Sequence, residues 1–331
     1  MDAEPDVEEE AQQTADDYFE FPPVDAALPV SSFGETWGYL IAGEESALNA
    51  RLPLSDVVYH SANINSYGKL RGVPNPKNAP RFGGRLHMDV MCDSMTLTHF
   101  VLMPGSKERQ ELIADLLEAA KNFDGLQIDF ENIPDRDGAA FLSFLAELRA
   151  GLKDKMFTIA LKARMRTISN DVYDYAKIKP LVDRILVMAY DEHWSTSAPG
   201  PIASMDFCKK VAEHSLRTIG PEKLIMGVPF YGRTWGNVKL INWNRAFYYT
   251  GIERIKRENN VTEVRRVGGI PTFNFTFTYQ VPITVTGYYD DEYSLSARLE
   301  MYRTMGVKSV GFWRIGQETP AIWKLLKLDA K

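Results

Sequence analysis

The sequence predicts an α/β fold, a (β/α)8 TIM barrel with a small α+β insertion, from three observations. Short apolar runs alternate with amphipathic, helix-like stretches along most of the 331 residues. Eight such runs occur, and eight parallel strands close a barrel. Hydrophobic residues make up 45% of the chain, which is enough for a sizeable core. An open, doubly wound parallel sheet is the structural alternative.

The predicted strands are short apolar runs bounded by turn residues, and the predicted helices repeat apolar residues every three or four positions. The strands are expected at 36–41, 56–63, 85–91, 125–130, 157–161, 185–190, 224–230 and 309–312. Helical spacing is clearest at Leu112, Leu116 and Ala120, at Phe141, Phe144 and Leu148, and at Leu295, Leu299 and Tyr302.

The N-terminal part differs in composition from the rest of the chain. Residues 1–25 contain ten carboxylates, and the first basic residue is Arg51. Residues 1–30 are therefore predicted to be a solvated, disordered tail, and residues 31–331 the barrel. The whole chain has a net charge of −6 and no basic run, so nucleic acid is not an expected partner.

One segment breaks the alternation of strands and helices. About fifty residues, 236–287, separate the seventh predicted strand from the last crossover helix. That length is too great for a structureless loop in a compact domain. A helix at 249–259 and strands at 263–267 and 272–279 are predicted within it. We expect a small α+β insertion over the carboxyl face of the barrel, where barrel enzymes keep their active sites.

Several classes of site and location are disfavoured by the composition. Cys92 and Cys208 lie 116 residues apart in apolar segments, which predicts buried thiols. The five histidines lack metal-ligand spacing, so neither a metal nor another cofactor is expected. The sequence contains no run of 18 apolar residues, so no membrane span is predicted. The first residues also lack the features of a signal peptide.

The fourth predicted strand carries the strongest chemical signal. Side chains alternate along a strand, so Gln127, Asp129 and Glu131 point to one face while Leu126 and Ile128 point to the other. Two carboxylates should then face the barrel interior, where burial is costly unless they share protons or hydrogen bonds. The alternative interpretation is that these acids are solvated residues at a strand end or a helix cap for the next segment.

The segment Asp124 to Glu131 resembles the D-x-x-D-x-D-x-E signature of glycoside hydrolase family 18. Asp124, Asp129 and Glu131 occupy its first, third and fourth acidic positions, and Gln127 occupies the second. An amide at that position resembles the branch of the family that acts on bacterial cell walls, including spore-cortex-lytic enzymes. Segments 187–201, 226–233, 288–291 and 311–316 also resemble the family, so the similarity spans about residues 36–328.

The resemblance implies a substrate-assisted mechanism, in which the sugar's own 2-acetamido group attacks the anomeric carbon. Glu131 is expected to protonate the glycosidic oxygen, which requires a raised pKa. Asp129 is expected to hydrogen-bond the acetamide nitrogen, with Asp124 behind it, sharing a proton with Asp129 or tuning it. Tyr190 is expected to donate its hydroxyl to the acetamide oxygen.

Aromatic and polar residues near other strand ends complete the expected site. Trp313 is expected to form the apolar floor beneath the sugar that is attacked. Asp191 and Arg233 are candidate substrate contacts, but they lie in adjacent loops and could instead form a structural ion pair with each other. Trp194 and Trp235 could be sugar platforms or supports for the insertion, and Trp194 is the better candidate for a platform. The expected substrate-binding residues are Trp313, Asp191, Gln127, Trp194, Tyr231 and Arg233.

The resemblance, carried by Glu131, Asp129 and Tyr190 on the predicted strands, implies a retaining glycosidase that hydrolyses β-1,4 linkages of a glycan containing N-acetylglucosamine. The resemblance to the cell-wall branch favours peptidoglycan over chitin-type oligosaccharides. The alternative is a catalytically silent glycan-binding or scaffold protein on the same barrel. A cell-wall substrate implies a location outside the cytoplasm with an export segment absent from this sequence, and a cytoplasmic location is the other option. The sequence gives no signal for an oligomeric state.

Overall fold

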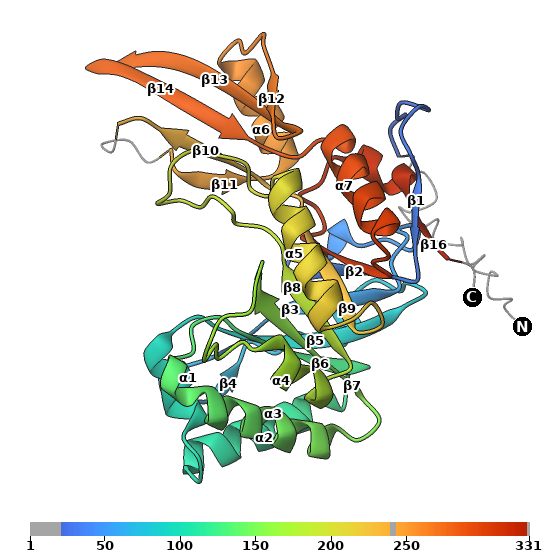
Figure 1. Ribbon diagram of the computed structural model, residues 1–331, viewed down its shortest axis with the longest axis vertical. Helices are drawn as coiled ribbons and strands as arrows, with labels where there is room; N and C mark the ends of the chain where they lie inside the picture. Colours follow the sequence, from blue (N-terminus) through green and yellow to red (C-terminus); the bar gives the residue numbers. More distant parts are fainter. Residues whose placement is uncertain (1–20, 239–242, 330–331) are drawn as a thin grey trace, which may run out of the picture.

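The computed structural model describes residues 21–238 and 243–329. Within those ranges, eight parallel strands form a closed barrel (Figure 1), in the order β2-β15-β9-β8-β7-β6-β5-β3. Pairing of β2 with β3 closes the ring. The predicted (β/α)8 barrel is therefore confirmed, and the open sheet is excluded.

All eight predicted strands are present, with ends that differ by at most two residues from those expected. A ninth strand, β4 (Leu70–Arg71), extends β3 as an antiparallel hairpin. The barrel strands are β2 (Glu35–Ile41), β3 (Asp56–Ile64), β5 (Arg85–Cys92), β6 (Gly125–Phe130), β7 (Met156–Lys162), β8 (Arg184–Met188), β9 (Leu224–Pro229) and β15 (Ser309–Trp313).

Helices cover the outside of the barrel from the third strand onward. The connections 42–55 and 65–84 contain no α-helix, only β4 and the 3-10 turns η2 (Glu45–Ala47) and η3 (Pro76–Asn78). The described helices outside the insertion are α1 (Met95–Leu102), α2 (Lys107–Ala120), α3 (Gly138–Leu152), α4 (Tyr175–Ile178), α5 (Met205–Thr218) and α7 (Glu292–Thr304). Further 3-10 turns are η4 (Asp135–Asp137), η5 (Lys179–Leu181) and η6 (Pro320–Leu325).

The alternation of side chains divides the apolar core into two layers. Phe130 points outward from β6 and stacks on Phe141 and Phe144 of α3, with ring centroids 6.5 and 5.7 Å away. A separate cluster fills the inside of the barrel and includes Trp37 and Tyr39. Inward positions near the carboxyl end are thus the ones that can reach a substrate.

The insertion is a five-stranded antiparallel sheet with one helix in its described part. It projects from one end of the barrel (Figure 1), with its own apolar core. The sheet starts at Gly232 and ends at Tyr288, slightly outside the expected 236–287. Its elements are β10 (Gly232–Gly236), β11 (Arg245–Phe247), α6 (Tyr249–Glu258), β12 (Arg265–Val267), β13 (Ile270–Tyr279) and β14 (Val281–Tyr288).

The two ends of the described chain meet on the barrel's outer surface, where β1 (Ser31–Phe33) pairs in parallel with β16 (Leu326–Leu328). Most of the tail predicted at 1–30 lies outside the described residues. Leu28 packs against the core, and the hydroxyl of Ser296 donates to the carbonyl of Pro29 (2.9 Å).

Two further expectations concern the cysteines and membranes. Cys92 and Cys208 are both buried and free, as predicted. No helix in the described ranges combines the length and apolar character needed to cross a bilayer.

Candidate active site

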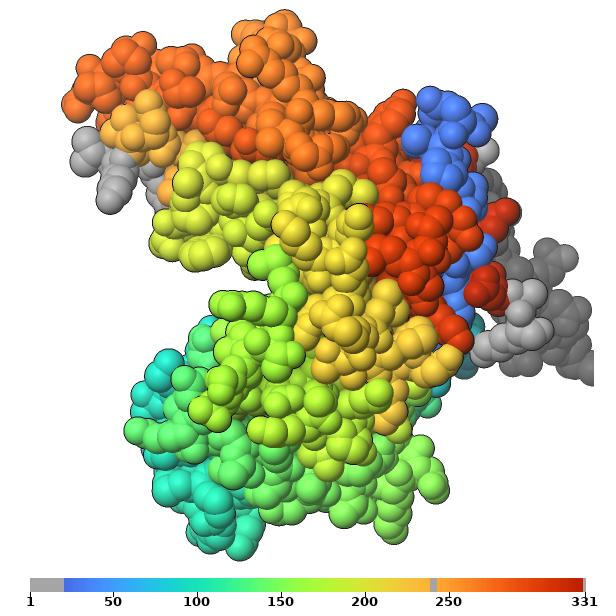
Figure 2. All heavy atoms as spheres, viewed as in Figure 1, coloured from blue at the N-terminus to red at the C-terminus, as the bar shows by residue number. Residues whose placement is uncertain are grey.

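A cavity of about 980 Å³ lies at the carboxyl ends of the barrel strands. Barrel residues such as Asp129 and Glu131 line one side, and Arg233 and Ala246 of the insertion sheet line another. Figure 2 shows the surface hollowed between the insertion and the lower part of the barrel. The insertion therefore forms a wall of the cavity that the barrel alone would leave open.

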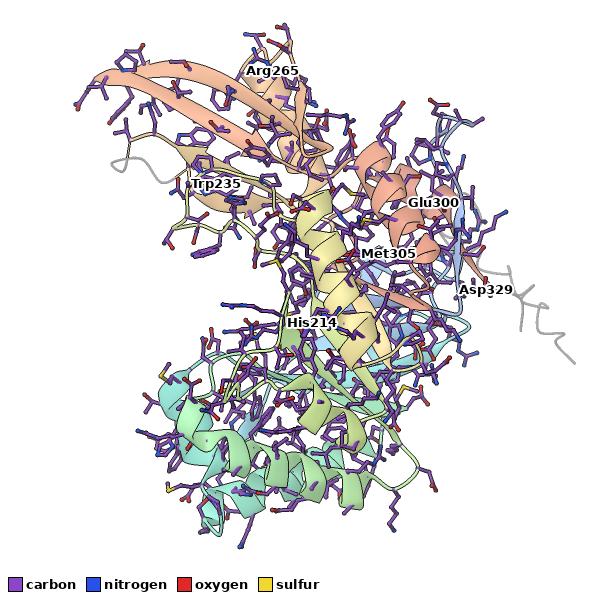
Figure 3. The ribbon with its side chains drawn as sticks, viewed as in Figure 1. His214, Trp235, Arg265, Glu300, Met305 and Asp329 are labelled. Carbon is purple, nitrogen blue, oxygen red and sulfur yellow. The ribbon has the colours of Figure 1, made fainter. Side chains whose placement is uncertain are left out.

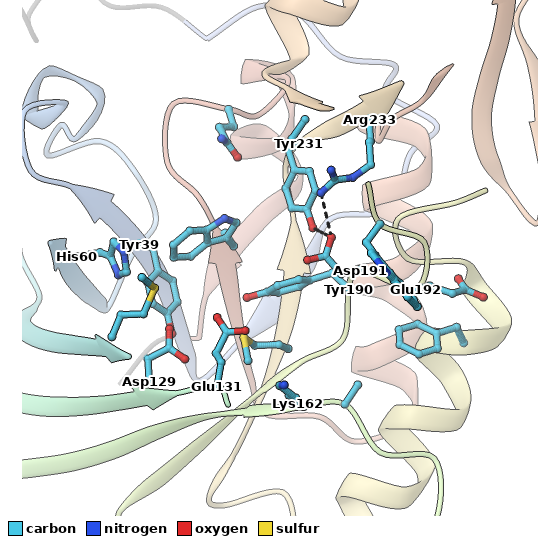
Figure 4. A pocket seen from close by; sticks show the side chains of 18 of the residues that line it. Tyr39, His60, Asp129, Glu131, Lys162, Tyr190, Asp191, Glu192, Tyr231 and Arg233 are labelled. Carbon is cyan, nitrogen blue, oxygen red and sulfur yellow. Dashed lines mark hydrogen bonds and ion pairs between the residues drawn. The ribbon is translucent and has the colours of Figure 1, made fainter. Parts of the chain in front are cut away.

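Strand β6 brings the two central carboxylates to this cavity. Asp129 is an inward residue of the strand and is 4% exposed, and Glu131 follows the strand and is partly exposed. The backbone N–H of Glu131 donates to the carbonyl of Cys92 (2.9 Å), which fixes the end of β6 against β5. Both carboxylates line the same cavity (Figure 4), as the alternation along the strand predicts.

Their surroundings favour the protonated form of both groups. Burial raises the pKa of Asp129 well above its usual value, and the charges of Glu131 and Asp89 raise it further. Burial also raises the pKa of Glu131, and Asp191 adds to that effect while Lys162 opposes it. A carboxyl group that keeps its proton at higher pH and lines an open cavity can act as a general acid.

Gln127 supports the site from below and does not line the cavity. The side chain is fully buried; the hydroxyl of Tyr39 donates to its Oε1, and its Nε2 donates to Oγ1 of Thr158 (3.0 Å). The expectation that Gln127 contacts substrate is wrong, because both ends of its amide are held by neighbouring strands.

Asp124 lies at the opposite end of β6. It is exposed, precedes the first strand residue, and its Oδ2 accepts from the backbone N–H of Leu86 (2.7 Å). Asp129 lies five positions further along the chain, which corresponds to roughly 16 Å of strand. The prediction that Asp124 shares a proton with Asp129 is wrong, because that position of the motif falls at the amino end of the strand.

A second polar group lies across the cavity, at the ends of β8 and β9. The hydroxyl of Tyr231 donates to Oδ1 of Asp191, and Nη2 of Arg233 is 3.6 Å from the same oxygen (Figure 4). The structural ion pair considered for these residues is therefore present, and all three side chains also line the cavity. Tyr190 lines it too, edge-on to Tyr231 with centroids 6.4 Å apart.

Aromatic side chains supply the apolar surfaces of the cavity. Trp313 ends β15 and contacts Tyr39 and His60 edge-on, each with centroids 5.1 Å apart. Trp194 also lines the cavity and is 51% exposed, whereas Trp235 is 2% exposed. Trp235, on β10 of the insertion (Figure 3), donates from Nε1 to the carbonyl of Trp194 (3.0 Å). Trp194 is thus placed to meet a ligand, and Trp235 supports its loop.

Four polar residues near the site were missed by the sequence analysis: Tyr39, His60, Asp89 and Lys162. His60 and Asp89 form a pair with Nδ1 2.6 Å from Oδ2. Both lie on predicted strands, so their presence on the inward face could have been found from alternation, but their pairing could not. Among the described residues, no group of three or more His, Cys, Asp or Glu is arranged to hold a metal ion.

Comparisons with known proteins agree with this geometry. The chain is 26% identical over 243 residues to YvbX of Bacillus subtilis (strain 168), an uncharacterized glycosylase, covering 70% of this chain and 69% of that one. It is 22% identical over 245 residues to a cortical fragment-lytic enzyme of Bacillus anthracis, covering 68% of this chain. The match spans about half, 54%, of that relative's length.

Solved structures show the same fold at low sequence identity. The spore cortex-lytic enzyme SleL of Bacillus cereus superposes with a TM-score of 0.78 at 20% identity, covering 90% of this chain and 76% of that one. The model of the family described as glycosyl hydrolases family 18 matches residues 85–318, which is more than half of the chain. The protein therefore belongs to glycosyl hydrolases family 18.

Proposed function

We propose that the protein is a retaining glycosidase that hydrolyses β-1,4 linkages of glycans containing N-acetylglucosamine, with Glu131 as the general acid. One observation carries the proposal. Glu131, whose pKa is raised, lines an open cavity. Next to it lies a second carboxyl group, Asp129, whose pKa is raised even more strongly by burial. An acid that keeps its proton near the operating pH is what cleavage of a glycosidic bond requires.

The proposed first step transfers the proton of Glu131 to the glycosidic oxygen as the bond from that oxygen to the anomeric carbon breaks. The nucleophile is proposed to come from the sugar and not from Asp129, because burial disfavours the ionised carboxylate that would have to attack. The 2-acetamido oxygen of the sugar fills that role and forms a cyclic oxazolinium intermediate. Water then opens this ring, with Glu131 taking back a proton, and the original configuration is restored.

The other residues of the cavity would hold the sugar in the reactive geometry. Asp129 would bind the acetamide N–H, and Tyr190 would donate its hydroxyl to the acetamide oxygen. Trp313 would pack against the apolar face of the same sugar. Asp191, Tyr231 and Arg233 would contact hydroxyl groups of the glycan from the opposite wall, with Trp194 as an outer platform.

Peptidoglycan is the proposed substrate ahead of chitin, because the peptides attached to its glycan carry carboxylates, whereas chitin is uncharged. Lys210 and Arg233 line the cavity but pair with carboxylates, Lys210 with Asp206 at 2.5 Å. Lys162 lines it as well, and its Nζ donates to the amide oxygen of Asn132 (3.0 Å). Lys162 lies beside Glu131, and its hydrogen bond to a neutral amide leaves its positive charge available to bind an anionic glycan.

The test is hydrolysis of purified peptidoglycan and of N-acetylglucosamine oligosaccharides by the wild type and by Glu131→Gln. Glu118→Gln is the matched control, since Glu118 lies on α2 with a side chain that is 72% exposed. Mass spectrometry identifies the products, and NMR of the new reducing end reports its configuration. We expect peptidoglycan cleavage with retention by the wild type and the control, and none by Glu131→Gln.

Other outcomes would change the proposal in defined ways. Cleavage of the oligosaccharides alone would overturn the choice of peptidoglycan. Equal turnover by Glu131→Gln would overturn the role of Glu131. No cleavage by any protein, with glycan binding by all, would identify a catalytically silent glycan-binding barrel.

We also propose that the protein acts outside the cytoplasm, because peptidoglycan lies there. Fractionation of the native cells followed by detection with a specific antibody tests this. Recovery with the wall or the extracytoplasmic fraction is expected, and recovery confined to the cytoplasm would contradict it.

A further inference from the structure

A buried carboxylate on the strand next to Asp129 has no role in the proposed reaction. Asp89 is an inward residue of β5 and is fully buried. Its Oδ2 pairs with Nδ1 of His60 (2.6 Å), and its Oδ1 has no hydrogen-bond partner in the described part of the chain. A buried carboxylate oxygen without a partner is costly, so its position calls for an explanation.

The register of the sheet brings Asp89 close to Asp129. Strands β5 and β6 are parallel neighbours, with Asp89 opposite Gln127 and Met91 opposite Asp129. Asp89 and Asp129 are therefore diagonal neighbours on the inward face, with their Cα atoms roughly 8 Å apart. Oδ1 of Asp129 likewise has no hydrogen-bond partner among the described residues.

Along its own strand, Asp129 has no group two residues earlier with which to share a proton. Gln127 occupies that position, and Tyr39 and Thr158 hold both ends of its amide. The acidic neighbour below the cavity is instead Asp89, whose negative charge raises the pKa of Asp129 in addition to the larger effect of Glu131. Part of the electrostatic coupling of Asp129 thus runs across the sheet to β5.

His60 connects this buried pair to the cavity. Its side chain is 14% exposed, lines the cavity, and touches the ring of Trp313 edge-on. The pKa of His60 is raised by Asp89, although burial opposes the effect. When His60 is protonated, it balances the charge of Asp89. When His60 is neutral, an ionised Asp89, whose own pKa is raised by burial, leaves an unbalanced negative charge near Asp129.

We propose that His60 and Asp89 are positioning residues that set the protonation state of Asp129 from the neighbouring strands. The inference rests on the proposed function for its catalytic consequence, but the coupling itself belongs to the fold. Two residues outside the sequence motif, His60 and Asp89, would thus control the protonation of Asp129, which lies within the motif.

Other charged or titratable groups face the three residues and would contribute to any pH dependence. Those acting on Asp129 besides Asp89 are Glu131 at the end of β6 and Lys162 at the end of β7. His60 also feels Arg314, which follows β15, and Glu131. The phenols that face these carboxylates are Tyr39 of β2, toward Asp129 and Asp89, and Tyr190 after β8, toward Asp129.

The chain offers a matched control for this pair. His87 of β5 and Asp56 of β3 form a second buried pair, with Nε2 2.7 Å from Oδ1, on the same two strands with the residue types exchanged. That pair lies at the amino ends of the strands, and neither residue lines the cavity. His87→Gln therefore changes a similar buried pair away from the reacting groups.

The test is the titration of Asp129 by NMR in protein carrying 13C-carboxyl aspartate, with its signal assigned by comparison with Asp129→Asn. In the wild type, the Asp129 signal should show a second inflection where His60 titrates. Asp89→Asn should lower the pKa of Asp129 by about one pH unit or more. His60→Gln should abolish the second inflection, and His87→Gln should leave the Asp129 titration unchanged.

Kinetics on the cleaved glycan provide the second measurement. The pH profile of kcat should shift in Asp89→Asn and His60→Gln with KM within about twofold, and it should stay in place in His87→Gln. An Asp129 titration that moves in neither variant of the pair would overturn the inference. If the wild type cleaves nothing, the proposed function fails, and the NMR titration still decides whether the coupling exists. Should Asp89→Asn fail to fold, His60→Gln alone decides it.

Discussion

The carboxylates at the two ends of the barrel interior differ in their hydrogen-bond partners. At the amino end, Asp56 accepts from Nε of Arg85 and pairs with His87, both at 2.7 Å. Glu35 there lies 2.8 Å from Nη2 of Arg184. At the carboxyl end, Asp129 is buried without a hydrogen bond to its Oδ1 from any described residue.

The pKa values follow these partners. Burial alone would raise the pKa of Asp56, but hydrogen bonds from His87 and Arg85 outweigh it and lower that pKa. The same balance, with Arg184 as the main partner, lowers the pKa of Glu35. Burial raises the pKa of Asp129, and the lowering effect of Lys162 is too small to reverse that shift. Desolvation is thus common to both ends, and the supply of hydrogen-bond donors decides whether the pKa of a carboxyl is lowered or raised.

The largest expected effect is at the carboxyl end. Glu131→Gln removes the proposed proton donor and should reduce hydrolysis by about 10²–10⁴-fold, the usual contribution of general acid catalysis. Thermal unfolding followed by circular dichroism should show no loss of stability, because no described hydrogen bond to the Glu131 carboxyl is broken. A variant that lost activity only in proportion to its folded fraction would contradict this assignment.

The comparable change at the amino end should act on stability and leave activity intact. Asp56→Asn leaves His87 and Arg85 without their buried counter-charge and should lower the free energy of unfolding by about 3–5 kcal/mol. Urea denaturation measures the loss, and hydrolysis per folded molecule should be unchanged. The folded-state pKa of Asp56 is lowered. The contribution of its carboxylate to the free energy of unfolding is therefore present above the unfolded-state pKa and is lost as the pH falls through the folded-state pKa. The variant should lack that acid-side loss.

The opposite sign is expected for Asp129. Its folded-state pKa is raised, so its contribution to stability is present below the unfolded-state pKa and is lost as the pH rises to the folded-state value. Asp129→Asn should therefore be more stable than the wild type by about 1 kcal/mol or more at alkaline pH, since one pKa unit corresponds to about 1.4 kcal/mol. The gain should shrink as the pH falls. Denaturation at pH 5 and pH 8 compares the two, and a destabilised variant at pH 8 would refute this expectation.

Charges around Glu131 should move its titration in opposite directions. Lys162 lowers the pKa of Glu131 and Asp191 raises it. Lys162→Met should therefore shift the alkaline limb of the activity profile to higher pH, and Asp191→Asn should shift it to lower pH, each by up to about one unit. Shifts of the same sign in both variants would show that the limb does not report Glu131. Lys162→Met should also weaken the preference for an anionic glycan over a neutral one, measured as the ratio of kcat/KM values.

The smallest effect is expected where the motif and the structure disagree. Asp124→Asn changes an exposed side chain at the amino end of β6, so its activity should stay within about twofold of the wild type, as for most surface substitutions. A loss as large as that of Asp129→Asn, measured on the same glycan, would restore the role that the motif assigns to Asp124.

The sequence predicted the barrel well because its strands are apolar runs whose residues alternate between two buried faces. Asp129 and Glu131 were assigned to one inward face on that basis alone, and the structure brings both to the cavity. Asp124 was misplaced because the motif's spacing does not say where the strand begins. β6 starts at Gly125, one residue after it.

The pairing of His60 with Asp89 could not be predicted in the same way. These residues are 29 positions apart, and their contact depends on which strands are neighbours and in what register. The absence of α-helices from the connections 42–55 and 65–84 was also not anticipated. A strand crossover without a helix leaves no periodic signal, because a helical repeat is the feature that the sequence analysis can detect.

The most direct test of the difference between the two ends is one NMR titration of 13C-carboxyl aspartate, in which Asp56→Asn and Asp129→Asn spectra assign the two signals. Asp56 should titrate below the ordinary aspartate value of about 3.9, and Asp129 should titrate well above it. Two signals that titrate together near the ordinary value would contradict the claim that hydrogen-bond donors decide whether the pKa of a buried carboxyl in this barrel is lowered or raised.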